Sequence, residues 1–233
     1  MRFSRSLDRT FAQTNRLRTE GTDALLAAAR EAGVTRFVAQ SFASFRYARE
    51  GGPVKTEDDP LDPSPLPSTR ESQAAMRHLD EAVTAAGWIV LRYGGFYGAA
   101  NDGLVPPVRK RQFPIVGDGG GMASFIHLDD AAAATVLALE HGEPGIYNIV
   151  DDDPAPVREW LPAIAATIGA PPPRRVPRWV ARLMGEHVVS MMCEVRGASN
   201  AKARAQLDWA PQWPTWREGF AALGATRAPA RAA

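Results

Sequence analysis

The sequence contains a single cysteine, Cys193, in 233 residues. One thiol cannot form an internal disulfide, and no close pair of cysteine or histidine residues has the spacing of a metal site. We therefore predict a protein of a reducing compartment, the cytoplasm, with no bound metal.

Long hydrophobic runs and an excess of one charge are also lacking. No stretch approaches the ~20 apolar residues that span a bilayer, and the N-terminal stretch MRFSRSLDRTFAQTNRLR is charged throughout. Lys and Arg total 27 against 26 Asp and Glu, so the net charge is only +1. A charge so near zero gives no reason to expect a polyanionic partner. The sequence thus predicts neither a membrane nor a nucleic acid as partner, and leaves a small-molecule substrate.

Helical and strand-like patterns alternate along the first part of the chain. A helical pattern from Asp8 closes at Gly33, and a short β-rich run, Arg36 to Ser41, follows directly. A second helix, roughly 69–86, leads into the apolar run Ile89 to Tyr93. This repeated order indicates an α/β fold with a doubly wound parallel sheet.

The composition changes beyond Asp153. Seven prolines fall between positions 154 and 177, and five of the six tryptophans lie between positions 160 and 216. We therefore predict a sheet domain over residues 1–150 and a small, mostly helical C-terminal lobe over residues 151–233. The polar segment 46–68 is too long for a simple connection, so it is either a functional loop or disordered.

Motifs spread over nearly the whole chain carry a family resemblance. They are Asn15 with Glu20-Gly21-Thr22, Gly33 to Ser41, Glu57 with Pro60, Leu91-Arg92 with Tyr97-Gly98, Phe125 to Asp130, Ser199 to Ala203, and Leu207 to Pro211. Together they resemble the extended short-chain dehydrogenase/reductase superfamily and, within it, the NAD-dependent epimerase/dehydratase-like proteins. The resemblance implies a Rossmann-like domain that binds NAD or NADP over residues 1–150, and a substrate-binding lobe over residues 151–233.

One unit shared by that family is missing from the sequence. The family has a glycine-rich turn between its first strand and first helix, because backbone amides there approach the cofactor pyrophosphate. Gly117 to Gly121 neither follows a core strand nor opens a helix, so we interpret it as a hairpin turn. Two βα units, on the order of 60 residues, have no counterpart. We therefore expect an N-terminally truncated domain whose cofactor binding by itself is doubtful.

The family's Tyr-x-x-x-Lys pair also has no counterpart. In the family, the lysine lowers the pKa of the tyrosine, so that the phenol can exchange a proton with the substrate. The resemblance places Ser72 or Gln73 at the tyrosine position and Met76 or Arg77 at the lysine position. Family members without this dyad are termed atypical, and some bind the cofactor without any dehydrogenase chemistry.

The resemblance also assigns candidate site residues. Ser41 stands at the family's catalytic serine, although a strand-end capping hydroxyl is an equal interpretation. Tyr47, on the following loop, is the most plausible substitute acid. The predicted cofactor-binding residues are Asn15, Ser41, Tyr93, Gly94, Gly95 and Phe96, and the predicted substrate-binding residues are Arg109 and Arg196.

Two functional hypotheses follow. The first is an NAD(P)-dependent oxidoreductase or epimerase-like protein acting on the hydroxyl or carbonyl of a small or carbohydrate-like substrate. The second is a catalytically inactive, atypical member that acts as a nucleotide-binding sensor or scaffold. The missing dyad favours the second, whereas Ser41 and the glycine-rich strand end favour a ligand site. Family members commonly dimerise through the helices at 14–32 and 69–86, so a homodimer is a further expectation.

Overall fold

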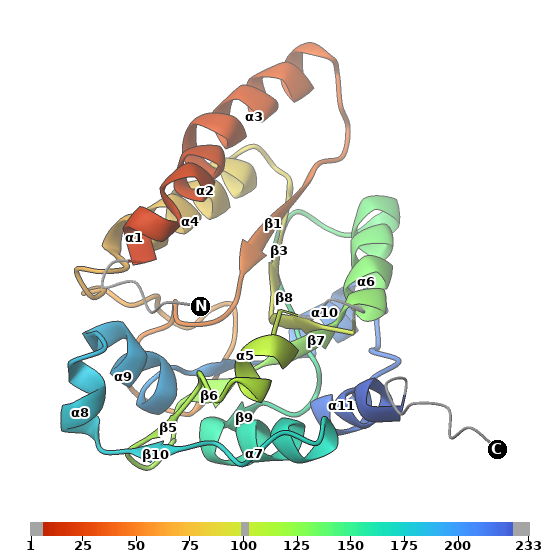
Figure 1. The fold of residues 1–233 in the computed structure, drawn as a ribbon. Coiled ribbons are helices and arrows are strands. Elements are labelled where there is room, and N and C mark those ends of the chain that lie inside the picture. Colours follow the sequence, from red (N-terminus) through yellow and green to blue (C-terminus); the bar gives the residue numbers. More distant parts are fainter. Residues whose placement is uncertain (1–6, 99–102, 226–233) are drawn as a thin grey trace.

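The computed structural model describes residues 7–98 and 103–225 (Figure 1). Its centre is a parallel sheet of three strands in the order β1-β3-β8. The strands are β1 (Val38–Phe42), β3 (Ile89–Tyr93) and β8 (Gly145–Ile149). All five residues of the middle strand β3 are buried. This arrangement confirms the predicted α/β fold with a parallel sheet.

Helices cover both faces of this sheet (Figure 1). On one face lie α3 (Thr22–Glu31) and α4 (Arg70–Ala85), joined to the sheet by a core that includes Leu26, Val83 and Val90. On the other lie α6 (Leu128–His141) and α10 (Ala201–Gln206), joined by a core that includes Leu91, Tyr147 and Leu207. α4 forms as an amphipathic helix because its buried apolar residues recur at three- and four-residue steps; they are Ala75, Met76, Leu79 and Val83.

The predicted single helix between Asp8 and Gly33 is wrong in detail. The segment comprises α1 (Leu7–Thr10), α2 (Ala12–Arg16), a π-helical turn (Leu17–Gly21) and α3. Within the π-helical turn, Thr19 Oγ1 donates to the carbonyl oxygens of Asn15 at 3.2 Å and Arg16 at 3.3 Å. A threonine hydroxyl that bonds to the preceding turn competes with the regular backbone ladder and bends it.

Asp8 caps α4 from a distant part of the chain. Thr69 precedes the first helical residue, but its side chain makes no capping bond. Instead, Asp8 in α1 accepts hydrogen bonds from the backbone amides of Glu71 at 3.0 Å and Ser72 at 2.8 Å. The carboxylate therefore satisfies amides that a helix start leaves without partners, and its charge suits the positive end of the helix dipole.

The long segment 46–68 is held by contacts within itself and with the C-terminal part of the chain. β2 (Val54–Lys55) pairs with β11 (Gly197–Ala198), and Tyr47 forms an isolated bridge with Leu61. The Arg49 guanidinium pairs with Asp62 at 3.2 Å. These contacts fold the segment on itself and join it to β11.

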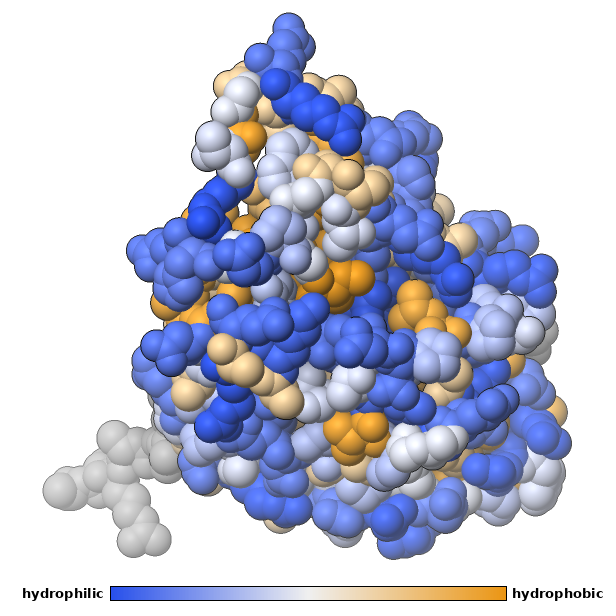
Figure 2. Space-filling view, turned by 180° about the vertical axis from the view of Figure 1, so that it is seen from behind, coloured by the Kyte–Doolittle hydropathy of each residue, from blue (hydrophilic) through white to orange (hydrophobic). Residues whose placement is uncertain are grey.

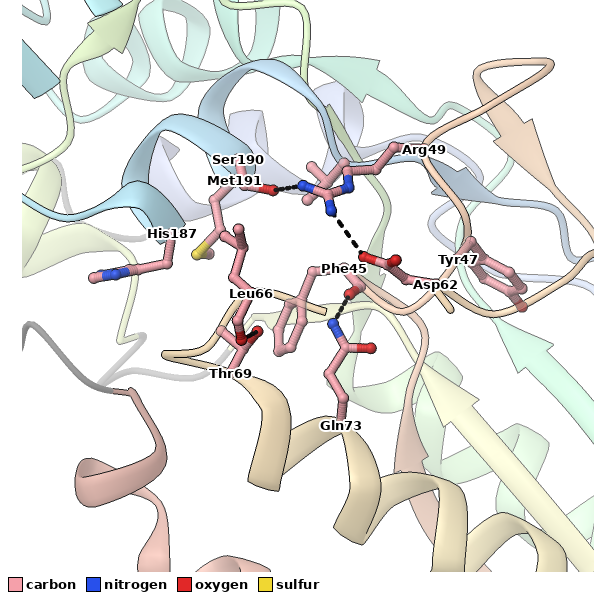
Figure 3. Close-up of a pocket in the computed structure, with 11 residues that line it drawn as sticks. Phe45, Tyr47, Arg49, Asp62, Leu66, Thr69, Gln73, His187, Ser190 and Met191 are labelled. Carbon is pink, nitrogen blue, oxygen red and sulfur yellow. Dashed lines mark hydrogen bonds and ion pairs between the residues drawn. The ribbon is translucent and has the colours of Figure 1, made fainter. Parts of the chain in front are cut away.

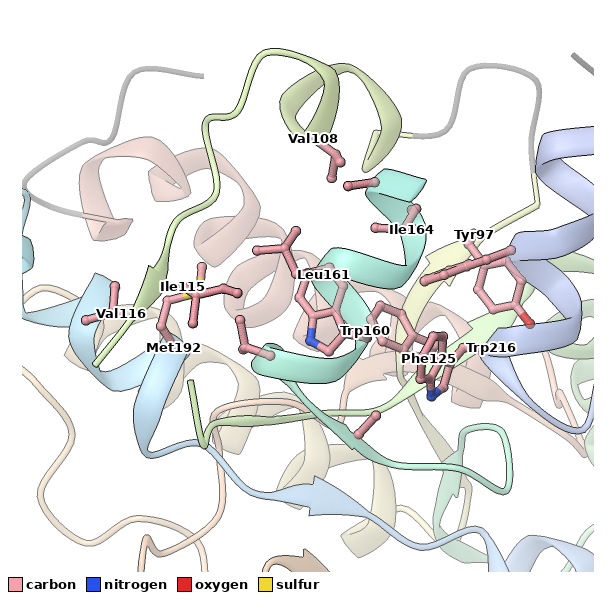
Figure 4. Packing of buried hydrophobic residues seen from close by; sticks show 14 of the residues in the cluster. Tyr97, Val108, Ile115, Val116, Phe125, Trp160, Leu161, Ile164, Met192 and Trp216 are labelled. Atoms are coloured by element: carbon pink, nitrogen blue, oxygen red, sulfur yellow. The ribbon is translucent and has the colours of Figure 1, made fainter. Parts of the chain in front are cut away.

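The C-terminal lobe is built around α7 (Val157–Thr167), whose Trp160, Leu161 and Ile164 face a second hydrophobic core (Figure 4). The ring of Trp160 packs edge-on against Phe125, with ring centroids 5.2 Å apart. The remaining elements of this region are β4 (Gly95–Tyr97), α5 (Val105–Arg109), β5 (Ile115–Val116), β6 (Met122–Ala123), β7 (Phe125–His127), β9 (Ala155–Pro156), β10 (Arg175–Val176), α8 (Arg178–Arg182), α9 (Glu186–Cys193) and α11 (Trp216–Ala225). Residues before position 150, such as Phe125, thus also belong to the core of the lobe.

The face of the molecule shown in Figure 2 carries few large hydrophobic areas. From behind, it is mainly hydrophilic, with small and separate hydrophobic areas (Figure 2). Leu17 and Leu25 are exposed on the N-terminal helices that we predict to lie at a dimer interface, and that dimer stays a prediction.

No helix within 7–98 and 103–225 has the length and apolarity needed to cross a bilayer. The described residues also include no group of three or more side chains arranged to hold a metal.

Asp151 is a buried carboxyl group directly after β8. Its side chain accepts a hydrogen bond from the backbone amide of Asp153 at 3.3 Å, and its Oδ2 has no partner among the described residues. Burial penalises the charged form and raises the pKa of Asp151 to about 8. The carboxyl group therefore keeps its proton in the folded protein at neutral pH.

Asp151→Asn is expected to stabilise the protein at alkaline pH and to leave its stability unchanged near pH 4. An unfolded aspartate titrates at about 3.9, whereas the folded one titrates at about 8. Between these values the unfolded chain has released a proton that the folded chain still holds, so wild-type stability falls as the pH rises from about 4 to about 8. Urea unfolding at several pH values measures the difference. The exposed Asp58→Asn is the control, and a gain that does not grow with pH would contradict the prediction.

Candidate active site

A cavity of about 510 Å³ lies beyond the carboxyl end of β1, between the N-terminal helices and the C-terminal lobe. Phe42, Ser44 and Phe45, at and after the end of β1, form one part of its wall. Its lining is largely apolar, with aromatic and methionine side chains from both sides: Phe11, Phe45, Phe113, Trp160, Met76, Met122, Met191 and Met192. A concave apolar site at strand ends is the usual place for a ligand in an open α/β sheet.

One of the two pairs of positions that the resemblance offers for the dyad faces this cavity. Ser72 and Met76, both on α4, line it. The two alternative positions turn to the loop instead, because Gln73 donates to the Phe45 carbonyl at 2.8 Å and Arg77 donates to a backbone carbonyl of segment 46–68 at 3.4 Å. If Ser72 and Met76 are the dyad positions, as one reading of the resemblance predicts, the cavity wall carries a serine and a methionine in place of the tyrosine and the lysine.

The hydroxyl of Ser72 is already engaged. Its Oγ donates to Asp8 Oδ1 at 2.7 Å and accepts from Asn15 Nδ2 at 3.1 Å. Asn15, a predicted cofactor ligand, is buried and contacts this serine on the cavity wall. Its Oδ1 has no partner among the described residues, so the amide retains one acceptor.

Ser41 is the penultimate residue of β1, directly before the wall residue Phe42; it is buried and does not itself line the cavity. Its Oγ accepts a hydrogen bond from Arg46 Nη1 at 3.0 Å. The same guanidinium nitrogen lies 2.6 Å from Asp80 Oδ2. A serine oxygen that accepts from a guanidinium keeps its own proton available for donation.

Two arginines share one carboxylate beside Ser41. Arg92 approaches the same Asp80 Oδ2 through Nε at 2.9 Å and through Nη2 at 2.7 Å. All three side chains are at most 4% exposed. Burial lowers the pKa of Arg46, yet an arginine stays protonated at neutral pH. This cluster of Arg46, Asp80 and Arg92, the arginine cluster below, therefore holds one positive charge in excess.

Tyr47 is buried within a polar network, although a loop tyrosine more often faces solvent. Its hydroxyl donates to Asn148 Oδ1 at 2.9 Å and accepts from Arg92 at 3.3 Å. Burial raises the pKa of Tyr47, so its phenolate is harder to form. The ring borders a small pocket together with Arg49, Asp62 and Gln73 (Figure 3). Its role as a substitute acid stays a prediction.

The glycine pair after β3 has a packing reason. A Cβ at Gly94 would lie 2.7 Å from the Ser124 carbonyl oxygen and 3.0 Å from the Phe125 backbone. Phe96 is 39% exposed, and the Tyr93 hydroxyl bonds Thr135 Oγ1 at 2.6 Å. The Tyr93 side chain thus turns to α6, and only its backbone remains for the predicted contact with a cofactor.

The two arginines predicted to bind substrate do not line the cavity. Arg109 Nη2 approaches the Ile168 carbonyl at 3.5 Å. Arg196 Nη2 donates to the Arg49 carbonyl, which ties the lobe to the long segment. The structure therefore does not bring either arginine together with Ser41, and their substrate contacts stay a prediction.

Two polar side chains on the cavity wall carry no motif in the sequence. His187, on α9, is 3% exposed and borders both the cavity and the small pocket. Arg18, in the π-helical turn, is half-buried on the opposite wall. Only the fold brings them to one space, because 169 positions separate them along the chain, and no local pattern around either residue indicates a ligand.

The comparisons with known proteins agree with this geometry. Residues 6–150 match the model of the NAD dependent epimerase/dehydratase family. The chain belongs to this family. A 3-diazoavenalumate denitrifying reductase from Streptomyces sp is 44% identical over 219 residues, which cover 90% of this chain and 72% of that relative. The family assignment confirms the resemblance seen in the motifs.

Solved structures of the epimerase/dehydratase type share the fold. A dTDP-glucose 4,6-dehydratase from Streptomyces venezuelae, with NAD bound, aligns with a TM-score of 0.70 at 23% identity, over 94% of this chain and 68% of that one. A human epimerase family protein, with NADPH bound, aligns with a TM-score of 0.72 at 18% identity, over 89% and 72%. The chain also spans 50% of two further curated relatives, a reductase and a ketoreductase. At these identities the structural likeness shows the fold alone.

Proposed function

We propose that the protein acts as an NAD(P)-dependent reductase of a small, largely apolar substrate. The observation that carries the proposal is the apolar cavity, which lies at the carboxyl end of β1 and against the family's dyad positions on α4. The relative that is 44% identical is named a reductase, which supports reduction over epimerisation. An apolar lining suits an aryl or alkyl substrate better than a carbohydrate, whose hydroxyl groups would lose hydrogen bonds there.

The cofactor would be NAD or NADP, which supplies a hydride when bound. The residues present fit only part of it: the strand ends at Ser41 and Gly94 and the acceptor of Asn15 suit the nicotinamide end. Within residues 7–98 and 103–225, no glycine-rich turn joins a strand to a helix in a way that could hold the pyrophosphate. We therefore propose that full cofactor affinity requires such a turn in addition to these residues.

The proposed roles of the chain's own residues follow from the geometry. Ser41 would donate its hydroxyl proton toward a substrate atom that gains negative charge, since its oxygen already accepts from Arg46. The excess charge of the arginine cluster would stabilise that developing negative charge in a site that excludes water. Met76 carries no charge that could activate a phenol, as the family's lysine does. It would therefore contribute only apolar contact.

Calorimetry and isotope transfer test this function. We expect a longer chain that carries a glycine-rich turn ahead of Met1 to bind NAD(H) or NADP(H), and this chain alone to bind neither. We further expect deuterium transfer from 4-deuterated cofactor to a member of a panel of 3-oxoalkanoates and aryl diazo compounds. Ser41→Ala should lower kcat about 100-fold, whereas Ser64→Ala on the long segment should not. Cofactor binding without any transfer would favour the sensor or scaffold hypothesis and overturn the reductase.

A further inference from the structure

His187 lines the cavity with a buried imidazole. Neither Nδ1 nor Nε2 has a hydrogen-bond partner among the described residues, although the side chain is almost fully buried. The imidazole points away from the Arg49–Asp62 ion pair of the small pocket (Figure 3). Burial lowers the pKa of His187, so the ring is neutral at physiological pH and can donate through one nitrogen and accept through the other. A buried polar side chain without a partner is costly, and a bound ligand relieves that cost.

Arg18 offers a guanidinium from the opposite wall. It makes no hydrogen bond or ion pair with the described residues, in contrast to Arg16, whose Nη2 lies 2.8 Å from the exposed Glu20. Burial lowers the pKa of Arg18, and the negative charge of Asp80 offsets part of that effect. Asp80 already balances the nearer Arg46 and Arg92. Arg18 therefore adds a positive charge to this end of the cavity, and no carboxylate among the described residues forms an ion pair with it.

We propose that the cavity binds an aromatic carboxylate, with the carboxylate on Arg18 and a second polar group of the substrate on His187. A guanidinium group can donate two parallel hydrogen bonds to the two oxygens of a carboxylate. Between the two polar walls, Phe11, Phe45 and Trp160 provide faces against which an aromatic ring can pack. The inference names the substrate class of the proposed reductase and rests on that function for its biological meaning.

Calorimetry of the wild-type chain with three probes tests the proposal: cinnamate, cinnamyl alcohol and 4-hydroxycinnamate. Cinnamate should bind more tightly than cinnamyl alcohol, which lacks the charge. Arg18→Gln should weaken cinnamate binding about 10- to 100-fold, because a hydrogen-bonded charge pair is lost, and should leave cinnamyl alcohol binding unchanged. Arg16→Gln, on the same helical segment, is the matched control and should change neither.

The contact with His187 has its own readout. 4-Hydroxycinnamate should bind more tightly than cinnamate by about 2- to 10-fold, the value of one hydrogen bond. His187→Leu should abolish that difference while retaining cinnamate binding, whereas His78→Gln on the surface should preserve it. Equal binding of cinnamate and cinnamyl alcohol, a parallel loss of both in Arg18→Gln, or no binding of any probe would overturn the proposal. The binding measurement needs neither cofactor nor turnover, so its result can be interpreted even if the reductase assay fails.

Discussion

Replacing Asp80 by asparagine is expected to lower the free energy of unfolding by about 3–5 kcal/mol. In the wild-type protein the Asp80 carboxylate lies 2.6 Å from the Arg46 guanidinium and 2.7 Å from that of Arg92. The substitution leaves both buried guanidinium groups without a counter-charge. An uncompensated charge in the interior costs far more than the lost attraction between two exposed groups. Urea unfolding followed by far-UV circular dichroism measures the loss.

Two further variants separate this explanation from a general loss of packing. Glu20→Gln removes the carboxylate of an exposed ion pair with Arg16 and should change stability by less than about 0.5 kcal/mol. Arg46→Met on the Asp80→Asn background should recover part of the loss, because one of the two unpaired charges is gone. A double variant less stable than Asp80→Asn would show that packing around Arg46, and not its charge, dominates.

Trp216→Ala is expected to destabilise the protein by about 3–5 kcal/mol, the range for deleting a buried aromatic side chain. Trp216 is fully buried in the core of the lobe, and its ring centroid lies 5.4 Å from that of Phe220. The Arg217 guanidinium also covers its ring at 4.1 Å, so a cation–π contact disappears with it. Thermal unfolding of wild type and variant at equal concentration gives the difference.

Trp179 provides the matched control for that substitution. It is 69% exposed on α8, and Trp179→Ala removes the same side chain from a surface position. Its effect should stay within about 0.5 kcal/mol. Equal destabilisation by the two variants would mean that α8 packs against a surface that its exposure does not reveal.

The central sheet could be predicted closely from local patterns. The predicted run 89–93 is strand β3, and the predicted helix 69–86 is α4 with one residue fewer at each end. Both are apolar or amphipathic segments followed by a glycine. Gly33 and Gly87, which follow the helices α3 and α4, adopt positive φ values of 65° and 78°. Such signals are local, so a sequence pattern carries them in full.

Most of the candidate site could not be predicted, because it depends on contacts between distant positions. The motifs led to Ser41 and to the altered dyad on α4. No pattern indicated that Tyr47 would be buried against Asn148, 101 positions later, or that Arg18 and His187 would share a cavity. Charge pairing also acts over long separations, and the partner of Arg46, Asp80, lies 34 positions away.

The cap that Asp8 gives to α4 bears on cooperativity. A helix that borrows its N-terminal cap from another segment is not an autonomous folding unit, because its first turn is complete only when that segment has docked. α1 and the start of α4 should therefore open and close together as one cooperative unit. Since Ser72 belongs to that first turn and lines the cavity, this part of the cavity wall should be complete only when α1 is docked.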